Sequence, residues 1–235
     1  MSMTATFKHV PPGALDILRR RPALIERIVF DRGQSVAEAN LAWAAAQGGV
    51  VGAPPLATVL ERMETQLAAL PGSQRDLVRQ QIDSIRALLV PRANAGRPRR
   101  APAPLPDGLE GAPTLDIDKA WHGLHFLLTG SVDESPGPLG DAVMGGREFG
   151  PDLGYGPMRS LDAARVAETS AALDALTAAE VEARYEASAM ERAGVYPGGW
   201  SSPGSRQWLL ETFEDVRGFY REAAGAGHAM LLYLV

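Results

Sequence analysis

Strand-like segments stand at both ends of this chain, and they constrain its fold more than any other feature. Residues 3–10 run into Pro11, Pro12 and Gly13, which interrupt a helix or a central strand. Residues 229–235 read AMLLYLV, an apolar run that follows glycine and His228 and is typical of a buried strand. Since most of the intervening sequence is helical in pattern, we expect one α+β domain over 1–235, whose small sheet includes both terminal strands and is covered by several helices.

Helical patterns fill much of the sequence between these ends. A mainly helical region is predicted over 11–90, with an inserted helical hairpin at 55–90 whose apolar residues recur at helical spacing. Ser35 with Glu38, Thr177 with Glu180, and Ser188 with Glu191 form the S/T-x-x-E pattern of a capping box at a helix start. Further helices are predicted near residues 14–20, 35–48, 117–128, 161–176 and 205–224.

Residues 91–113 are rich in proline, glycine and arginine and contain few large apolar side chains. Such a composition buries too little apolar surface to offset the entropy lost on ordering, so we expect an exposed linker without regular structure. Its four arginines, at 92, 97, 99 and 100, lack interleaved aromatic residues, which favours a solvated loop over a nucleic-acid contact.

Composition excludes several classes of protein. The 235 residues include no cysteine, which rules out disulfides, thiolate metal sites and cysteine nucleophiles. No apolar run approaches the roughly 18 residues of a membrane helix, and the N-terminal residues lack the apolar core of a signal peptide, so we expect a cytoplasmic protein that binds no membrane. The net charge of −5 combines a basic region 1–104 with an acidic region 105–235, which argues against nucleic-acid binding.

Glycines are frequent between residues 130 and 157, where they indicate tight turns and short strands. Backbone amides exposed at such turns bind anions, so a phosphate cradle is one interpretation. The segment has neither GxxxxGK[ST] nor GxGxxG opening a helix, and turn formation explains the glycines more simply than nucleotide binding does.

One group of residues suggests chemistry. Asp118, His122 and His125 fall at i, +4 and +7 of the predicted helix 117–128, within a narrow arc beside Trp121. Two imidazoles and a carboxylate are suited to Zn, Fe or Mn, or to acid–base chemistry. The spacing matches no established metal motif, so a structural role is the alternative: Asp118 at the helix start, His122 exposed, and His125 at the core boundary beside a polar cleft. We expect no bound metal and no cofactor.

A second group of residues suggests a ligand pocket. It comprises Trp121, Tyr155, Arg159, Tyr196 and Trp200, with the arginine available for a carboxylate or phosphate. Aromatic residues in such positions also cover hydrophobic cores, and Trp121 shares a predicted apolar helix face with Ile117, Leu124 and Leu128. We therefore expect Trp121 to anchor the core, and the pocket remains one of two interpretations.

Several segments of the chain, together with the opening strand, resemble one family. They are LDIDKAWHGLHFLLTG (115–130), AVMGGREFG (142–150), GYGPMRSL (154–161), RYEASAMERAGVYPGGW (184–200) and the C-terminal LLYLV. Over the opening strand and residues 113–235 the chain resembles the YfbM-like family of small bacterial proteins. This resemblance implies an α+β fold and a cytoplasmic bacterial protein, with no established activity. In such relatives His125 lies in the core of the motif, whereas the position of His122 is not always histidine.

Two classes of function remain. The lack of a strong catalytic motif, the acidic C-terminal half and the helical hairpin favour a non-catalytic binding or protein-interaction module with a protein or small-molecule partner. The alternative is a small metal-dependent or acid–base enzyme, hydrolase-like, centred on Asp118, His122 and His125. A sequence with one ambiguous cluster favours the binding module, and the enzyme stays open.

Overall fold

The fold is described from a computed structural model, for residues 3–29 and 103–235. The predicted helix at 35–48, the helical hairpin at 55–90 and residues 91–102 of the predicted linker lie outside the described residues. Five strands form one sheet in the order β2-β1-β5-β4-β3, and every neighbouring pair is antiparallel. The strands are β1 (Ala5–Val10), β2 (Thr114–Asp116), β3 (Arg147–Asp152), β4 (Pro157–Leu161) and β5 (Ala229–Leu234). With its accompanying helices this sheet makes the chain an α+β protein, as the sequence predicts.

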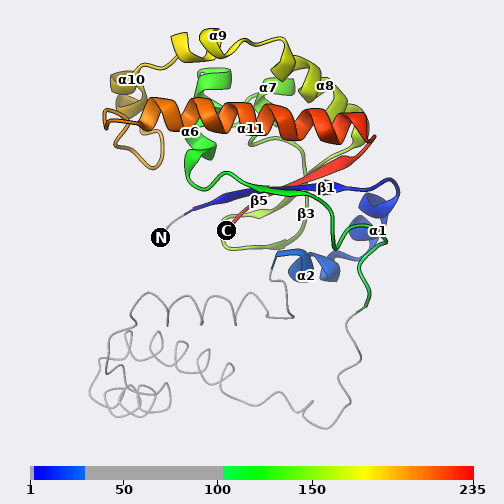
Figure 1. Cartoon of the computed structure of the whole chain (residues 1–235). Coiled ribbons are helices and arrows are strands. Elements are labelled where there is room, and N and C mark those ends of the chain that lie inside the picture. The colour runs from blue at the N-terminus through cyan, green and yellow to red at the C-terminus, as the bar shows by residue number, and fades with distance from the viewer. Residues whose placement is uncertain (1–2, 30–102) are drawn as a thin grey trace, which may run out of the picture. The chain divides into compact units, whose positions relative to one another are not determined.

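The two ends of the chain meet in the middle of this sheet. Strand β5 pairs with β1 from Ala5 opposite Leu234 to Val10 opposite Ala229, and its other edge pairs with β4. In Figure 1 the blue β1 and the red β5 run side by side. All six residues of β1 are buried, because both faces of the sheet are covered. The prediction that the terminal strands share a sheet is confirmed.

Helices lie on both sides of the sheet (Figure 1). On one side are α6 (Ala120–Thr129), α7 (Pro138–Asp141), α8 (Ala163–Asp174), α9 (Ala178–Ala183), α10 (Ala187–Arg192) and α11 (Ser205–Gly225). On the other side are α1 (Ala14–Arg20), the 3-10 turn η1 (Pro22–Leu24) and α2 (Ile25–Val29). None of the helices in the described part of the chain combines the length and apolar content that spanning a membrane requires.

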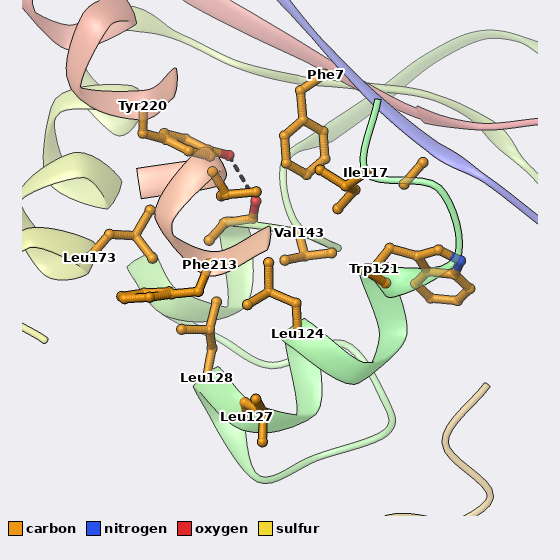
Figure 2. Packing of buried hydrophobic residues seen from close by; sticks show 14 of the residues in the cluster. Phe7, Ile117, Trp121, Leu124, Leu127, Leu128, Val143, Leu173, Phe213 and Tyr220 are labelled. Atoms are coloured by element: carbon orange, nitrogen blue, oxygen red, sulfur yellow. Dashed lines mark hydrogen bonds between the residues drawn. The ribbon is translucent and has the colours of Figure 1, made fainter. Parts of the chain in front are cut away.

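The larger hydrophobic core fills the space between the sheet, α6 and α11. Figure 2 shows Leu124 of α6, Phe213 and Tyr220 of α11 and Phe7 of β1 entering one cluster. The hydroxyl of Tyr220, which is fully buried, donates a hydrogen bond of 3.0 Å to the backbone oxygen of Ala142. The apolar stripe that predicts the long C-terminal helix is therefore the stripe that α11 buries.

A smaller core lies under the opposite face of the sheet, and it includes one residue of the predicted linker. Residues 103–113 contain turns and neither helix nor strand, as the composition indicates. However, Leu109 has no exposed surface and packs in the cluster that includes Val10, Leu18 and Met158. Most residues of 103–113 are exposed, as the composition indicates, but Leu109 anchors this part of the segment to the sheet.

The start of the helix predicted over 117–128 is also different. Residues 114–116 form β2 and pair with β1, and the helix begins only at Ala120. Asp116 does not cap a helix: its side-chain oxygen accepts a hydrogen bond of 2.8 Å from the Asp118 backbone in a turn. Ile117 is buried in this turn, as it would be on a helix face, so the apolar pattern does not distinguish the two conformations.

Two short helices test the capping predictions. At α9, Thr177 and Glu180 form the predicted capping box, with each side chain bonded to the other residue's backbone N–H. At α10 the prediction is wrong, because the N-cap is Glu186 and not Ser188. The Glu186 carboxylate accepts from the backbone N–H groups of Ser188 and Ala189, so the helix begins one residue before the predicted cap.

Candidate functional site

The structure separates the three residues predicted to share a helical arc. His122 and His125 lie on α6, but Asp118 belongs to the preceding turn, where it is exposed and has a φ of 46°. Because Asp118 is outside the helix, the i, +4, +7 geometry expected for the acid–base group is wrong. Within residues 3–29 and 103–235, no three His, Cys, Asp or Glu residues are grouped so that they could hold a metal ion.

His122 uses both ring nitrogens to hold neighbouring loops. Its Nδ1 accepts a hydrogen bond of 2.9 Å from the backbone N–H of Tyr196, and its Nε2 lies 2.9 Å from the backbone oxygen of Val132. A ring that accepts at Nδ1 and donates at Nε2 is the neutral tautomer. The ring also stacks on Trp121 at a centroid distance of 4.8 Å. His122 is half-buried, less exposed than predicted, and it ties α6 to two loops.

His125 is more buried than the sequence suggests. It has no exposed surface, although we expect it from the sequence to border a polar cleft. Its Nε2 lies 2.9 Å from the backbone oxygen of Asp133, while its buried Nδ1 makes no hydrogen bond within the described residues. Burial lowers the pKa of His125 below its ordinary value, and the hydrogen bond to Asp133 opposes this only in part. His125 therefore behaves as a neutral core histidine.

Of the five residues predicted to form a ligand pocket, three line one cavity in the structure. This cavity, referred to below as the sheet pocket, has a volume of about 220 Å³ and lies on the face of the sheet that α6 covers. Trp121 comes from α6, Arg159 from β4, and Tyr155 from the turn between β3 and β4. The remaining lining residues are Ala5, Phe7, Val143, Met144, Glu148, Gly156, Pro157, Leu232, Tyr233 and Leu234.

A row of side chains across four strands forms one wall of the sheet pocket. Phe7 of β1 is paired with Leu232 of β5, Leu232 with Arg159 of β4, and Arg159 with Glu148 of β3. Directly paired residues of an antiparallel sheet point to the same face. The wall therefore changes, strand by strand, from aromatic and aliphatic to charged, which suits a ligand with one apolar and one polar end.

The charged end of this row is already internally paired. Arg159 donates to the carboxylates of Glu134 and Glu148, the latter at 2.8 Å, and to the backbone oxygen of Met144. Burial lowers the pKa of Arg159, but the two glutamates outweigh this and hold the pKa above its ordinary value. Two carboxylates therefore already face the one guanidinium, and binding of a carboxylate or phosphate by Arg159 stays a prediction from the sequence.

Tyr196 and Trp200 do not line the sheet pocket. Tyr196 stacks on Trp121 at 5.9 Å, and its hydroxyl accepts a hydrogen bond of 2.9 Å from the Met3 backbone, so it supports the indole. Trp200 is 2% exposed and donates from Nε1 to the backbone oxygen of Val195 at 2.9 Å. Its ring lies against Gly123, where an added Cβ would come within 2.5 Å of it. Trp200 therefore belongs to the core.

The sequence interpretation missed the partner of Arg159. Glu148 lies in an exposed strand that carries no strong pattern of its own, and its role depends on the register of the β3–β4 hairpin. The glycines at 154 and 156 signal the turn of that hairpin. Counting residues outward from this turn along both strands is the one sequence signal that places Glu148 near Arg159. The register shifts between Phe149 and Asp152, so a simple count does not give the observed pairing.

Comparison with known proteins assigns the chain to a family. The structure is similar to that of YfbM from Escherichia coli, a protein of unknown function, with a TM-score of 0.53, 17% identity and 99% of each chain covered. No curated protein matches the chain significantly. The family model "Domain of unknown function (DUF1877)" matches residues 1–233, which includes the region 11–100 that the sequence resemblance leaves out. The chain is a member of this DUF1877 family.

Proposed function

We propose that the protein is a non-catalytic binding protein whose sheet pocket holds a small, neutral or cationic molecule with a flat apolar part. The observation that carries this proposal is the cross-strand row from Phe7 to Glu148, covered by Trp121. Small-molecule sites commonly combine mostly apolar walls with a few oriented polar groups. The volume of about 220 Å³ is below the usual range for drug-sized ligands, so a small metabolite fits best.

The charges around Arg159 favour a cation over an anion. Glu134 and Glu148 both bond the guanidinium, and their side chains are 62% and 52% exposed. This cluster carries one net negative charge, which attracts an ammonium group and repels a carboxylate. The aromatic ring of Tyr155, which also lines the sheet pocket, is a surface on which a flat or cationic group packs well, whereas the Trp121 indole is already stacked with His122 and Tyr196.

Binding without catalysis is supported by how the reactive groups are used. The carboxylate of Glu148 and the guanidinium of Arg159 are bonded to each other. The Nε2 atoms of His122 and His125 face backbone oxygens, and neither histidine lines the sheet pocket. The enzyme alternative requires Asp118, His122 and His125 on one face of the same helix, and Asp118 lies outside that helix. A protein partner and a cytoplasmic location stay predictions from the sequence.

A calorimetric titration with two matched probes tests the proposal. 2-Phenylethylamine carries an apolar ring and an ammonium group, whereas 3-phenylpropanoate carries the same ring and a carboxylate. We expect the amine to bind more tightly than the acid, and Glu148→Gln to weaken amine binding about two- to fivefold, because the charge pair is partly exposed.

A filling variant identifies where the probe binds. Met144→Trp places an indole at the lining of the sheet pocket and should abolish binding of the amine. Leu210→Trp is the matched control, since Leu210 is partly buried against the core and is not part of the lining. Equal amine binding by both variants, or tighter binding of the carboxylate by the unmodified protein, would overturn the proposal.

A further inference from the structure

A second cavity, with a volume of about 450 Å³, opens on the described part of the chain and shares no lining residue with the sheet pocket. It lies where α1, α7 and α8 meet the ends of β3 and β4. Its lining includes three arginines, and we refer to it as the arginine groove. The lining residues are Arg19, Asp141, Gly146, Arg147, Ser160, Leu161, Asp162 and Arg165.

Two of the three arginines lack an anionic partner. Arg165 pairs with Asp141 and Glu168, and Asp162 accepts a hydrogen bond from the Arg165 backbone as the N-cap of α8. Arg147 is exposed and makes no ion pair within residues 3–29 and 103–235. Arg19 makes none there either. Asp141 is thus paired with Arg165 and Asp162 caps α8, and the lining as a whole, with three arginines and two aspartates, carries one net positive charge.

A serine hydroxyl connects these two arginines. Arg19 donates from Nη2 to Ser160 Oγ at 2.9 Å, and Ser160 Oγ donates to the backbone oxygen of Arg147 at 3.2 Å. A neutral hydroxyl satisfies one N–H of Arg19 but does not balance its charge. The Nε atom of Arg19 is inaccessible to water and has no acceptor among the described residues. A partly buried guanidinium in this condition is stabilised by a nearby anion.

The paired glycines of MGGREFG keep this site open. Gly146 has a φ of 101°, and a Cβ there would lie 2.9 Å from the backbone oxygen of Ser160. At Gly145 a Cβ would overlap Asp141. Without a side chain, Gly146 allows the close approach of β4 to the start of β3, and Gly145 allows that of α7. The glycines lead directly into Arg147, which lines the groove and is paired in the sheet with Ser160, the residue that Arg19 bonds.

The geometry points to an oxyanion site: we infer that the arginine groove binds a phosphate group between the guanidinium groups of Arg19 and Arg147. Guanidinium groups bond the oxygens of phosphate with more than one N–H, which suits two arginines facing one group. The phosphate is either inorganic or carried by a small ester. This inference does not depend on the sheet pocket, because the two cavities have separate linings.

Titration of the full chain with inorganic phosphate and with phenyl phosphate tests the inference. Binding is measured by calorimetry, with sodium chloride of equal ionic strength as the reference. We expect Arg147→Ala and Arg19→Ala each to weaken binding about tenfold or more, because each removes charged hydrogen bonds to the anion. The tighter of the two probes then identifies the source of the phosphate group.

Arg206→Ala is the matched control, because Arg206 is exposed on α11 and outside the groove. It should bind phosphate as the unmodified protein does. Arg19→Ala also loses the hydrogen bond to Ser160, so the exposed Arg147 is the decisive position, and Arg147→Lys should recover part of the affinity. Phosphate binding that is no stronger than the chloride effect, or that is unchanged in Arg147→Ala, would overturn the inference.

Discussion

The Nε2 atom of His125 and the backbone oxygen of Asp133 lie 2.9 Å apart in a part of the core where His125 has no exposed surface. Burial lowers the pKa of this imidazole below its ordinary value of 6.5. The folded state therefore binds the proton less readily than the unfolded state. Stability that is fully present above pH 6.5 is lost as the pH falls through the lowered pKa.

We expect the free energy of unfolding to decrease between pH 7.5 and pH 5, as measured by urea denaturation. His9 contributes in the same direction, since burial also lowers its pKa. His125→Gln should flatten this dependence because it removes one of the imidazoles whose pKa is lowered by burial. If the free energy of unfolding depended on pH equally in His125→Gln and in the unmodified protein, this would contradict the lowered pKa of His125.

Two helix glycines should respond oppositely to alanine. At Gly123 in α6, an added Cβ would lie 2.5 Å from the Trp200 ring and 3.0 Å from Leu209, so we expect a loss of about 1–3 kcal/mol from overpacking. At Gly218 in α11 a Cβ meets nothing within 4 Å, and alanine should add about 0.5–1 kcal/mol through helix propensity. Thermal unfolding of both variants measures the difference. A stabilised Gly123→Ala would mean that Trp200 does not occupy this space.

Trp121 and Trp200 should be separable by combining stability with binding. Both are buried, at 6% and 2% exposure, and their replacement by alanine should cost about 3–5 kcal/mol in urea denaturation. Only Trp121 lines the sheet pocket, so only Trp121→Ala should also change the affinity for 2-phenylethylamine. Trp208→Ala, at a partly exposed position stacked on Trp200, should cost less than either. Unchanged stability in Trp121→Ala would show that this indole is not a core anchor.

Tyr220→Phe isolates one buried hydrogen bond. The change leaves the packing of the ring intact but removes the donor to the Ala142 backbone oxygen (Figure 2). We expect a loss of about 1–2 kcal/mol, since the carbonyl then stays buried without this partner. Burial also raises the pKa of Tyr220, so in an ultraviolet pH titration its phenol should ionise at a higher pH than an ordinary tyrosine does. If a phenol that ionises at the ordinary pH of tyrosine were lost in Tyr220→Phe, this would contradict the burial of Tyr220.

The sequence predicts the terminal strands and α11 well, because their signals are local. Proline residues end β1, and a continuous stripe of large apolar residues defines α11. Strand β2 is missed because its formation depends on pairing with β1, more than 100 residues earlier in the chain. Asp116 and Ile117 satisfy both a helix start and a strand followed by a turn, so composition alone does not decide between them.

The candidate site is predicted in part for a similar reason. Trp121, Tyr155 and Arg159 stand out as large side chains near glycines or on an apolar stripe, and the structure brings them to one cavity. Trp200 stands out equally, but the missing side chain at Gly123 gives its ring a place in the core. The charges that neutralise Arg159 come from Glu134 and Glu148, and no short-range pattern joins these three residues.

The position of β5 has a consequence for biosynthesis. Thr4 and Val235, 231 positions apart, exchange backbone hydrogen bonds of 2.8 and 3.0 Å, and β5 separates β1 from β4 in the sheet. While the ribosome is still translating residues before Ala229, β1 and the β3–β4 hairpin have no strand to join them. The nascent chain therefore carries an unfilled gap at the centre of its sheet until Ala229–Leu234 have been synthesised, and before then folding is limited to local helices, the β1–β2 pair and the β3–β4 hairpin.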